Sequence, residues 1–456
     1  MSNSLKLHFF GAAQTVTGSK YLLETPEKNI LIDCGMFQGI KELRLQNWND
    51  FPFRANEIDT VLLTHGHLDH CGYLPRLVKQ GFNGPIKGTA PTLAIASVIL
   101  RDSAVIQEEE AEQANEGGYS KHHPALPLYN QEDAESAIDL FRPIETDQWI
   151  SVSENIKCRF NKVGHIIGAT FIELEVFGKI IVFSGDIGRK GDPLLYPPEK
   201  PKWADIVVME STYGDRLHPE DDSESVLIEA VHQAIRDKGT IIIPSFAVER
   251  LQTLMYKLWI LYKKNKIPNI PVFVDSPMGN EVLDIFKRFD SWHKLTSSEF
   301  TAMTRHFNII TSYKDTWKTI DNKRPKIVIA GSGMVTGGRV LTYLRYYLEN
   351  PLTQVLLVGF QAEGTRGRRL LDGEQEIKLQ GKYIPVKAQI KTIESLSAHA
   401  DQGELIDWLI ELKNIPEQIF LVHGESQAME ALQEKIAQTY NWKTVLPHLN
   451  TTFKVI

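Results

Sequence analysis

The beginning of the chain alternates short apolar runs with glycine, asparagine and aspartate. The runs cover residues 5–10, 20–25, 29–34 and 59–64. Runs of this length between turn-forming residues are typical of strands in a packed sheet. Strand patterns return later, at residues 154–165, 170–188 and 206–212. Between them, residues 74–99 and their acidic continuation to residue 113 predict helix. Up to residue 212 the pattern therefore predicts sheets covered by helices.

The pattern changes after residue 212. Strand, turn and helix now repeat in this order, which implies parallel strands joined by crossover helices. The segments that show this repeat are 240–259, 270–289, 326–348 and 353–371. Beyond about residue 385 strands again mix with helices. We therefore expect a separate α/β domain in the middle of the chain.

Composition places the chain among ordinary globular proteins. Of its 456 residues 42% are hydrophobic and 23% are charged, which allows a sizeable core and excludes a largely disordered chain. The formal net charge of −7 argues against a histone-like binder of nucleic acids, because such proteins need a basic excess to neutralise phosphates. The net charge does not exclude local basic patches that bind nucleic acid.

The cysteines and the lack of long apolar runs indicate the cellular compartment in which the protein is expected. Cys34, Cys71 and Cys158 are far apart and form no CxxC pair, which favours a reducing environment. The first residues lack a signal-peptide pattern, and no run of about 18 apolar residues predicts a membrane helix. We expect a cytoplasmic protein with no membrane partner.

The most informative residues follow the apolar run that ends at residue 63. Three histidines and an aspartate stand close together there: His65, His67, Asp69 and His70. Imidazole and carboxylate groups are ligands that suit zinc. A lone His-x-His pair is more often an exposed loop, but this many buried polar groups are costly without a metal or partners. The loop therefore predicts a metal site, with Gly66 expected to supply the freedom for its turn.

A second metal ion would need ligands from other strand ends. His165 and Asp186 each follow a strand-like run and stand beside glycine, as the first loop does. Alone, each is more typical of a turn, but beside the histidine-rich loop each becomes a candidate ligand. A carboxylate such as Asp186 can bridge two cations, which lie roughly 3.5–4 Å apart in two-metal hydrolases.

These residues resemble the metallo-β-lactamase superfamily. Residues 65–70 match its His-x-His-x-Asp-His signature, His165 and Asp186 match its later ligands, and Asp33 in Leu-Ile-Asp-Cys-Gly matches its first motif. The resemblance implies an αββα sandwich with the metal ions at one edge. It also implies that Asp33 supports the ligand loop instead of binding metal.

Further motifs narrow the resemblance to the β-CASP branch, which processes nucleic acids. They are Glu210 in Met-Glu-Ser-Thr, His399 in Ser-Ala-His-Ala and His423 in Val-His-Gly. The implied fold class is α/β (α+β): an αββα metallo-β-lactamase sandwich with an inserted α/β β-CASP domain of mainly parallel sheet. The expected boundaries are 1–212 for the first part of the metallo-β-lactamase domain, 213–385 for the inserted β-CASP domain and 386–456 for the second part of the metallo-β-lactamase domain.

The resemblance also implies a role for each matched residue. Two zinc ions per chain are expected. Their implied ligands are His65, His67, His165 and Asp186 for one ion, and Asp69, His70, Asp186 and His423 for the other. A hydroxide bridging the two ions would attack a phosphodiester. His399 would protonate the leaving oxygen as general acid, with Glu210 orienting its ring, and Asp33 and Asp69 complete the implied catalytic set.

Three segments of the middle domain are candidates for binding phosphate. Glycines between a strand and a helix expose backbone N–H groups to an anion, and arginine binds phosphate oxygens at two points. Each segment alone is a weak signal, since solvated arginines at helix ends have the same pattern. Within the resemblance we expect them to bind substrate. The candidate residues are Ser245, Arg250, Ser332, Gly333, Gly337, Gly338, Arg339, Thr365, Arg366 and Arg368.

The leading hypothesis is a dizinc phosphodiesterase that cleaves single-stranded RNA inside the strand. A DNA-directed or 5′-exonucleolytic nuclease of the same family is the main alternative, because zinc hydrolysis needs no 2′-hydroxyl and nothing in the sequence reports on one. The inserted domain argues against a small-molecule metallohydrolase. The complete ligand set argues against a non-catalytic scaffold for RNA processing. A homodimer stays open.

Overall fold

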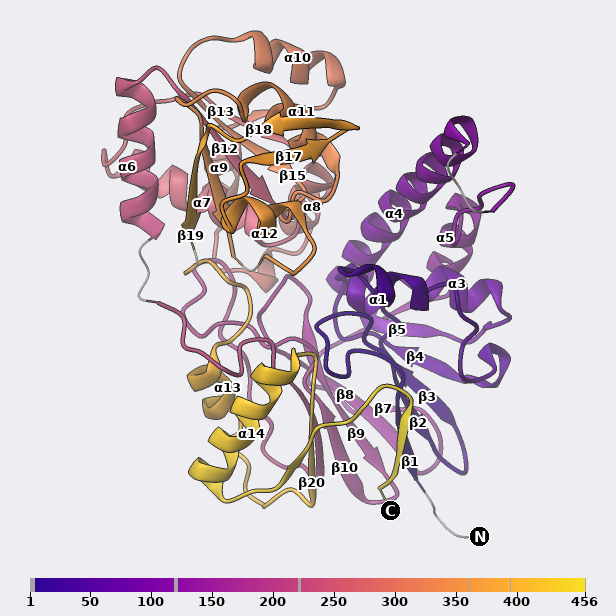
Figure 1. Cartoon of the computed structure of the whole chain (residues 1–456). Coiled ribbons are helices and arrows are strands. Elements are labelled where there is room, and N and C mark those ends of the chain that lie inside the picture. The colour runs from indigo at the N-terminus through magenta and orange to yellow at the C-terminus, as the bar shows by residue number, and fades with distance from the viewer. Residues whose placement is uncertain (1–4, 119–121, 220–222, 360, 394, 456) are drawn as a thin grey trace. The chain divides into compact units, whose positions relative to one another are not determined.

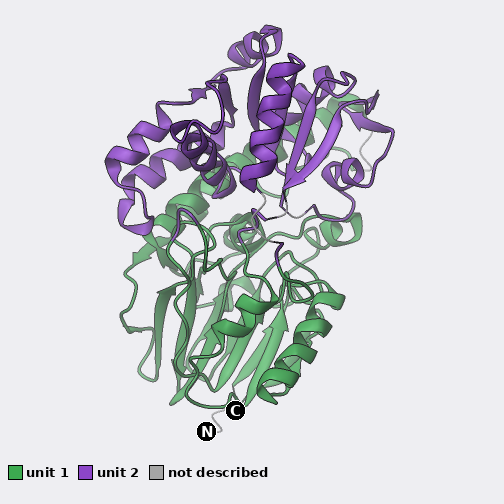
Figure 2. Ribbon diagram, turned by 90° about the vertical axis from the view of Figure 1, so that its left-hand side faces the viewer, with its two compact units in different colours: residues 1–192, 196–217, 399–456 green, residues 193–195, 218–398 purple. Residues whose placement is uncertain are grey.

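The computed structural model describes residues 5–118, 122–219, 223–359, 361–393 and 395–455. The chain forms two compact units (Figure 2). Unit 1 comprises residues 1–192, 196–217 and 399–456, and unit 2 comprises residues 193–195 and 218–398. Unit 1 is therefore assembled from segments on both sides of unit 2 in the sequence.

Two sheets of seven strands each form the centre of unit 1 (Figure 1). The first has the order β22 (Thr451–Lys454), β1 (Lys6–Phe9), β2 (Tyr21–Glu24), β3 (Asn29–Ile32), β4 (Thr60–Leu62), β5 (Ile86–Thr89) and β6 (Phe141–Ile144). The second has the order β21 (Thr444–Val445), β20 (Gln418–Val422), β11 (Ile206–Glu210), β10 (Lys179–Phe183), β9 (Thr170–Val176), β8 (Ile156–Lys162) and β7 (Ile150–Ser151).

Apolar side chains from both sheets pack into one core. Phe9, Tyr21 and Ile32 of the first sheet belong to the same buried cluster as Phe183 and Phe420 of the second. The rings of Phe9 and Phe420 lie 4.9 Å apart between centroids. Two sheets packed face to face in this way leave their outer faces for helices.

Helices cover both outer faces, so unit 1 has four layers (Figure 1). α4 packs on β5 and β6, and α14 packs on β20 and β21. The αββα sandwich expected from the sequence is confirmed. The helices of unit 1 are α1 (Lys41–Gln46), the 3₁₀ turn Ala55–Glu57, α2 (Leu68–Cys71), α3 (Leu74–Lys79), α4 (Ala90–Gly117), α5 (Gln131–Ile138), α13 (Gln402–Trp408) and α14 (Ser426–Tyr440).

The prediction of helix over residues 74–99 is wrong in its middle. The structure ends α3 at Lys79 and places the strand β5 before α4 begins. Gly81, Gly84 and Pro85 interrupt the helix, because Gly81 adopts φ +106° and proline cannot continue one. Thr89 then caps α4 by accepting a hydrogen bond from the backbone N–H of Thr92.

The longest described helix, α4, does not resemble a membrane span. It has 28 residues, and its second half carries several glutamates. Among the described residues, no helix combines the length and apolar character needed to cross a membrane.

Unit 2 is built on a six-stranded sheet in which all described strand pairs are parallel. Its order is β14 (Asn308–Ile309), β13 (Val272–Asp275), β15 (Lys326–Gly331), β12 (Thr240–Ser245), β16 (Gln354–Val358) and β19 (Gln389–Ile393). An antiparallel hairpin of β17 (Glu376–Leu379) and β18 (Lys382–Pro385) accompanies it. The parallel α/β character predicted for the middle of the chain is confirmed.

Crossover helices connect the parallel strands of unit 2. α11 packs on β12 and β15, where Val340, Tyr343 and Leu344 join the buried cluster of the sheet. The helices of unit 2 are α6 (Ser223–Arg236), α7 (Arg250–Lys263), α8 (Pro277–Arg288), the 3₁₀ turn Asp290–Trp292, α9 (Ser297–Thr304), α10 (Tyr313–Asp321), α11 (Gly338–Tyr347) and α12 (Arg366–Leu371).

Candidate metal centre

The residues predicted as metal ligands come together at one edge of unit 1. Strands β10, β11 and β20 run parallel, so the residues that follow them meet at the same edge of the sheet. The loop after β4 and the helix α2 approach this edge from the first sheet. The residues brought together are His65, His67, Asp69, His70, His165, Asp186 and His423.

Three residues at this edge have a left-handed backbone. Asp33, His165 and His423 adopt φ values of 58°, 60° and 48°. Aspartate and histidine tolerate this region better than most residues, and such conformations concentrate at functional sites. Asp33 and His423 directly follow β3 and β20, so the chain turns at these positions where the strands end.

Gly66 has a different role from the one expected. Its φ is not positive. A Cβ at this position would lie 2.7 Å from Cγ2 of Ile95 in α4. The glycine is therefore required because α4 packs closely against the histidine-rich loop.

The first group of candidate ligands consists of His65, His67, His165 and Asp186. One ligand atom of each lies within 4.8 Å of those of the others. Nδ1 of His67 lies 3.2 Å from Nε2 of His65 and 3.1 Å from Nε2 of His165. Oδ2 of Asp186 lies 3.5 Å and 3.4 Å from the same two Nε2 atoms. Four ligand atoms thus surround one point, as a tetrahedral zinc site requires.

The second group consists of Asp69, His70 and His423. Nε2 of His423 lies 3.3 Å from Oδ2 of Asp69 and 3.3 Å from Nε2 of His70. Nε2 of His70 in turn lies 3.2 Å from Oδ1 of Asp186. Asp186 therefore offers one carboxylate oxygen to each group.

The chemistry of this donor set fits metal ions. Oδ1 of Asp186 is buried and accepts no hydrogen bond, although Nε2 of His70 and Nδ1 of His423 face it at 3.2 Å and 3.6 Å. A buried carboxylate oxygen without a donor is costly unless a cation compensates it. Burial holds the pKa of His65 and of His165 well below the ordinary value, and burial lowers the pKa of His67 to about 4. These imidazoles are therefore neutral near pH 7, the form that binds metal.

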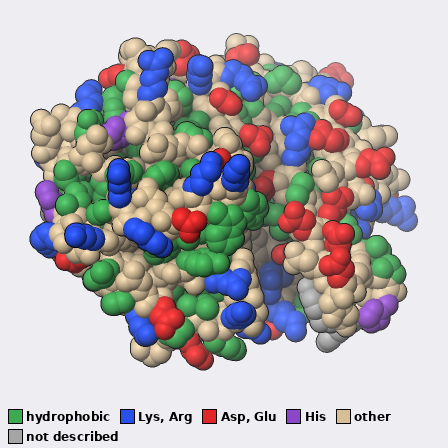
Figure 3. All heavy atoms as spheres, turned by 90° about the horizontal axis from the view of Figure 1, so that it is seen from above, with side chains coloured by type: hydrophobic (Ala, Val, Ile, Leu, Met, Phe, Trp, Pro, Cys, Tyr) green, Lys and Arg blue, Asp and Glu red, His purple; other side chains and the backbone are tan. Residues whose placement is uncertain are grey.

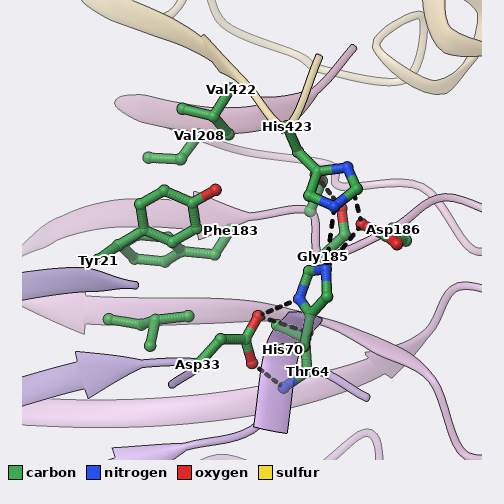
Figure 4. A pocket seen from close by; sticks show the side chains of 12 residues that line it. Tyr21, Asp33, Thr64, His70, Phe183, Gly185, Asp186, Val208, Val422 and His423 are labelled. Atoms are coloured by element: carbon green, nitrogen blue, oxygen red, sulfur yellow. Dashed lines mark hydrogen bonds and ion pairs between the residues drawn. The ribbon is translucent and has the colours of Figure 1, made fainter. Parts of the chain in front are cut away.

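Asp33 fixes the orientation of His70 (Figure 4). Its Oδ2 accepts a hydrogen bond from Nδ1 of His70 at 2.7 Å, and its two oxygens also accept from the backbone N–H and the hydroxyl of Thr64. This bond holds Nδ1 on Asp33, so Nε2 is the nitrogen of His70 that faces Asp186 and His423. Burial disfavours a charge on His70, but the carboxylates of Asp186 and Asp33 outweigh it and raise its pKa well above the ordinary value.

Replacing Asp33 by asparagine is expected to lower zinc affinity about 10- to 100-fold, the usual cost of losing an outer-shell partner of a metal ligand. Asparagine tolerates the positive φ at this position, so the change removes charge without straining the backbone. Zinc content after dialysis against a series of chelator concentrations measures the effect. Asp147→Asn is the matched control, since Asp147 is exposed and also has a positive φ, of 62°. Equal zinc retention in the two variants would contradict the prediction.

His399 and Glu210 form a pair beside the first group. Nδ1 of His399 lies 3.2 Å from Oε1 of Glu210, and its Nε2 lies 3.8 Å from Oδ2 of Asp186. Glu210 is buried and accepts backbone hydrogen bonds from Ile187 at 2.6 Å and from Thr212 at 3.2 Å. Burial opposes a charge on His399, but Glu210 and Asp186 outweigh it and raise its pKa to about 9.

The three segments predicted to bind phosphate lie together in unit 2. They follow the neighbouring strands β12, β15 and β16. A Cβ at Gly333 would lie 2.5 Å from the ring of Phe246, and the N–H of Gly367 donates to the carbonyl of Met334 at 3.0 Å. The carboxyl edge of a parallel sheet is where such folds bind ligands.

Several polar groups of these segments are engaged within unit 2. Oγ of Ser332 accepts from the N–H groups of Thr336 and Gly337. The guanidinium of Arg366 donates to the carbonyls of Val335, Thr336 and Lys378. These contacts shape the loops.

The remaining arginines differ in exposure. Arg250 is buried at the start of α7, whereas Arg368 is half-exposed and pairs with Asp372 at 2.9 Å. Nη1 of Arg339 donates to Oγ1 of Thr316 at 2.9 Å. A surface ion pair such as that of Arg368 is weak and leaves the guanidinium available to an anion.

Two polar residues at the metal centre were not predicted from the sequence. Oγ of Ser19 lies 3.3 Å from Nε2 of His70, and Oγ1 of Thr212 lies 3.1 Å from Nδ1 of His423. Thr212 stands two positions after Glu210 in the same motif, and Ser19 lies in a Thr-Gly-Ser turn between two strands. The position of Thr212 in the Glu210 motif and the Thr-Gly-Ser turn around Ser19 were the only sequence features that could have pointed to these two contacts.

Comparison with known families and proteins agrees with this geometry. The chain matches the metallo-beta-lactamase superfamily over residues 15–245, the Beta-Casp domain over 251–370 and the Zn-dependent metallo-hydrolase RNA specificity domain over 383–447. It is 33% identical to Ribonuclease TTHA0252 of Thermus thermophilus over 435 residues, 94% of this chain and 95% of that protein.

Relatives also occur among archaea and animals. Transcription termination factor FttA of Methanocaldococcus jannaschii is 29% identical over 97% of this chain and 70% of its own length. Integrator complex subunit 11 of Danio rerio is 27% identical over 99% of this chain and 74% of its own length. A solved structure of a protein of unknown function from Enterococcus faecalis covers 99% of this chain with a TM-score of 0.54 at 13% identity, which supports the fold alone. The chain is a member of the metallo-β-lactamase superfamily and belongs to its β-CASP branch.

Proposed function

We propose that the protein is a zinc-dependent ribonuclease that hydrolyses phosphodiester bonds inside single-stranded RNA. The observation that carries this proposal is the carboxylate of Asp186, which turns one oxygen toward each of two groups of candidate ligands. That arrangement suits a two-metal hydrolase. The match to an RNA specificity domain and the similarity to a named ribonuclease support RNA as the substrate.

Two zinc ions per chain are part of this proposal. His65, His67, His165 and Asp186 would hold one, and Asp69, His70, His423 and Asp186 would hold the other. When bound, zinc activates water near neutral pH and compensates negative charge on a phosphoryl oxygen. The buried Oδ1 of Asp186, which accepts no hydrogen bond, and the neutral imidazoles of the first group support this assignment.

We assign proton transfer to the pair of His399 and Glu210. The alkoxide that leaves a phosphodiester needs a proton, and a positioned histidine supplies one efficiently. The side chain of His399 is 20% exposed, and its Nε2 lies 3.8 Å from Oδ2 of Asp186, beside the candidate ligands. Glu210 accepts from Nδ1–H of His399, which leaves the Nε2 proton as the one to be donated.

The proposal is tested by a cleavage assay on single-stranded RNA and on DNA of the same sequence, each labelled either internally or at the 5′ end. We expect internal fragments from RNA, loss of cleavage with a chelator and recovery when zinc is added back. Internal labelling reports on cleavage anywhere in the strand, whereas the 5′ label distinguishes internal cuts from stepwise removal of nucleotides.

Other cleavage products would contradict particular parts of the proposal. Mononucleotides released from the 5′ end alone would identify an exonuclease, and equal cleavage of DNA would remove the preference for RNA. Cleavage of neither polymer, combined with hydrolysis of small esters, would overturn the assignment to phosphodiesters. Dimerisation, which the sequence left open, is measured on the same preparation by analytical ultracentrifugation.

A further inference from the structure

Three exposed aromatic rings lie on neighbouring helices of unit 2. Tyr313 and Trp317 stand one turn apart on α10, with 58% and 42% of their surfaces exposed, and Tyr346 of α11 is 52% exposed. The rings of Trp317 and Tyr346 meet edge to face at 5.3 Å, and the guanidinium of Arg339 lies 3.4 Å from the ring centre of Tyr313. We call these three rings, with Arg339, the aromatic surface.

The aromatic surface is anchored to a buried polar network. Thr316 of α10 donates to the carboxylate of Asp275 at 2.6 Å, and Tyr343 of α11 donates to it at 2.8 Å. Arg339 donates a hydrogen bond to the hydroxyl of Thr316. Asp275 is fully buried at the end of β13, so it ties both helices to the sheet. The exposed rings therefore stand on fixed helices, and little ordering is required when a ligand stacks on them.

The segments that carry the aromatic surface are basic, opposite in charge to the whole chain. Residues 313–324 and 338–347 contain six basic and two acidic side chains, in a chain of net charge −7. The basic residues are Lys314, Lys318, Lys323, Arg324, Arg339 and Arg345. Figure 3 views the molecule from above and shows hydrophobic, basic and acidic side chains together on this face. Such a surface attracts a polyanion.

The apolar part of the surface consists of aromatic rings. Among the exposed large hydrophobic side chains of the described chain, those within residues 313–324 and 338–347 are Tyr313, Trp317 and Tyr346, and none of the three is aliphatic. Protein-binding patches are enriched in Tyr, Trp and Arg but depleted of lysine at their centre, whereas single-stranded nucleic acids stack their bases on aromatic rings beside cations of either kind. Rings and cations together therefore favour RNA over a protein partner.

We propose that the aromatic surface binds single-stranded RNA by stacking bases on Trp317, Tyr346 and Tyr313, in addition to the strand segment that is cut. This inference rests on the proposed ribonuclease function for its ligand. Double-stranded RNA does not fit the surface, because its bases are paired and stacked on one another. The expected ligand is a strand with free bases and a phosphate backbone that pairs with the surrounding lysines.

The test measures binding without cleavage. A fluorescently labelled single-stranded RNA of about 20 nucleotides is titrated with the full-length protein in chelator, and binding is followed by fluorescence anisotropy. Trp317→Ala and Tyr346→Ala are each expected to weaken binding about 5- to 100-fold, the usual cost of removing a stacking ring. Trp317→Phe keeps a ring and should restore most of the affinity. Trp203→Ala is the matched control, since Trp203 is an exposed tryptophan of unit 1.

A second probe separates stacking from charge. Inorganic polyphosphate has no bases, so its binding should be the same for the Trp317 and Tyr346 variants and for the unaltered protein. Each variant should also keep its melting temperature and its rate on bis(p-nitrophenyl) phosphate. Together these results would assign the loss of RNA binding to the rings.

Two outcomes would overturn the inference. Unchanged RNA affinity in both alanine variants would do so, whether or not the protein cuts RNA. A change in self-association in place of RNA binding would assign the surface to a protein partner. Failure of the ribonuclease proposal is recognised separately, because an RNA that binds through these rings but is never cut leaves the stacking result intact.

Discussion

Replacing Asp186 by asparagine is expected to remove both metal ions and to lower RNA cleavage by at least about 10³-fold, since each metal ion contributes several kcal/mol to compensating transition-state charge. The physical reason is the position of Asp186, whose two oxygens face the two groups of histidines. Asparagine has the same size but offers one neutral oxygen. Elemental analysis of the purified variant measures zinc per chain, and circular dichroism verifies that it is folded.

Two single-site variants provide the comparison. His165 and His423 belong to different groups, and both adopt positive φ, so asparagine suits the backbone at either position. His165→Asn is expected to weaken the first site and His423→Asn the second, each leaving about one zinc per chain. Loss of both ions from either histidine variant, or retention of both in Asp186→Asn, would contradict a bridging role for Asp186.

Replacing His399 by alanine is expected to keep both zinc ions and most of the RNA affinity but to lower the cleavage rate by about 10²- to 10⁴-fold, the usual contribution of a positioned acid or base. Glu210→Gln should reduce the rate less, because it removes the charge beside Nδ1 and leaves the imidazole in place. Single-turnover rates at saturating protein separate the chemical step from binding.

An activated substrate distinguishes proton donation from metal support. Bis(p-nitrophenyl) phosphate has a leaving group that departs without a proton. If His399 is the general acid, His399→Ala is therefore far less impaired on this substrate than on RNA. Equal impairment on both substrates, or loss of zinc from the variant, would place His399 among the residues that support the metal ions and would assign the proton to another donor.

The strand pattern of unit 1 was readable because its central strands are short and largely buried. The runs at 29–34 and 59–64 became β3 and β4, which end directly before Asp33 and before the histidine-rich loop. The region 74–99 was misread, because a buried strand and a buried helix have the same apolar content over so few residues. The strand β5 is visible only once it pairs with β4 and β6.

The candidate ligands could also be predicted from the sequence, and the reason is chemical. Histidine and aspartate at the ends of buried strands are too costly to occur in such numbers without a cation. Ser19 and Thr212 were missed because hydroxyl residues in turns are common. Their contacts with His70 and His423 arise from segments that meet only in the folded chain.

The sequence by itself determined the two kinds of sheet and the family, and it supplied the candidate residues for the chemistry, because hydrophobic period and ligand type are local properties of the chain. Only the tertiary structure decided which residues share a site. It divides the candidate ligands into two groups around the oxygens of Asp186, assigns Gly66 to close packing against α4, and places Trp317 beside Tyr346 although they are far apart in sequence. These features depend on distances between side chains of different elements, and such distances are set by the packing of sheets and helices, which no local pattern records.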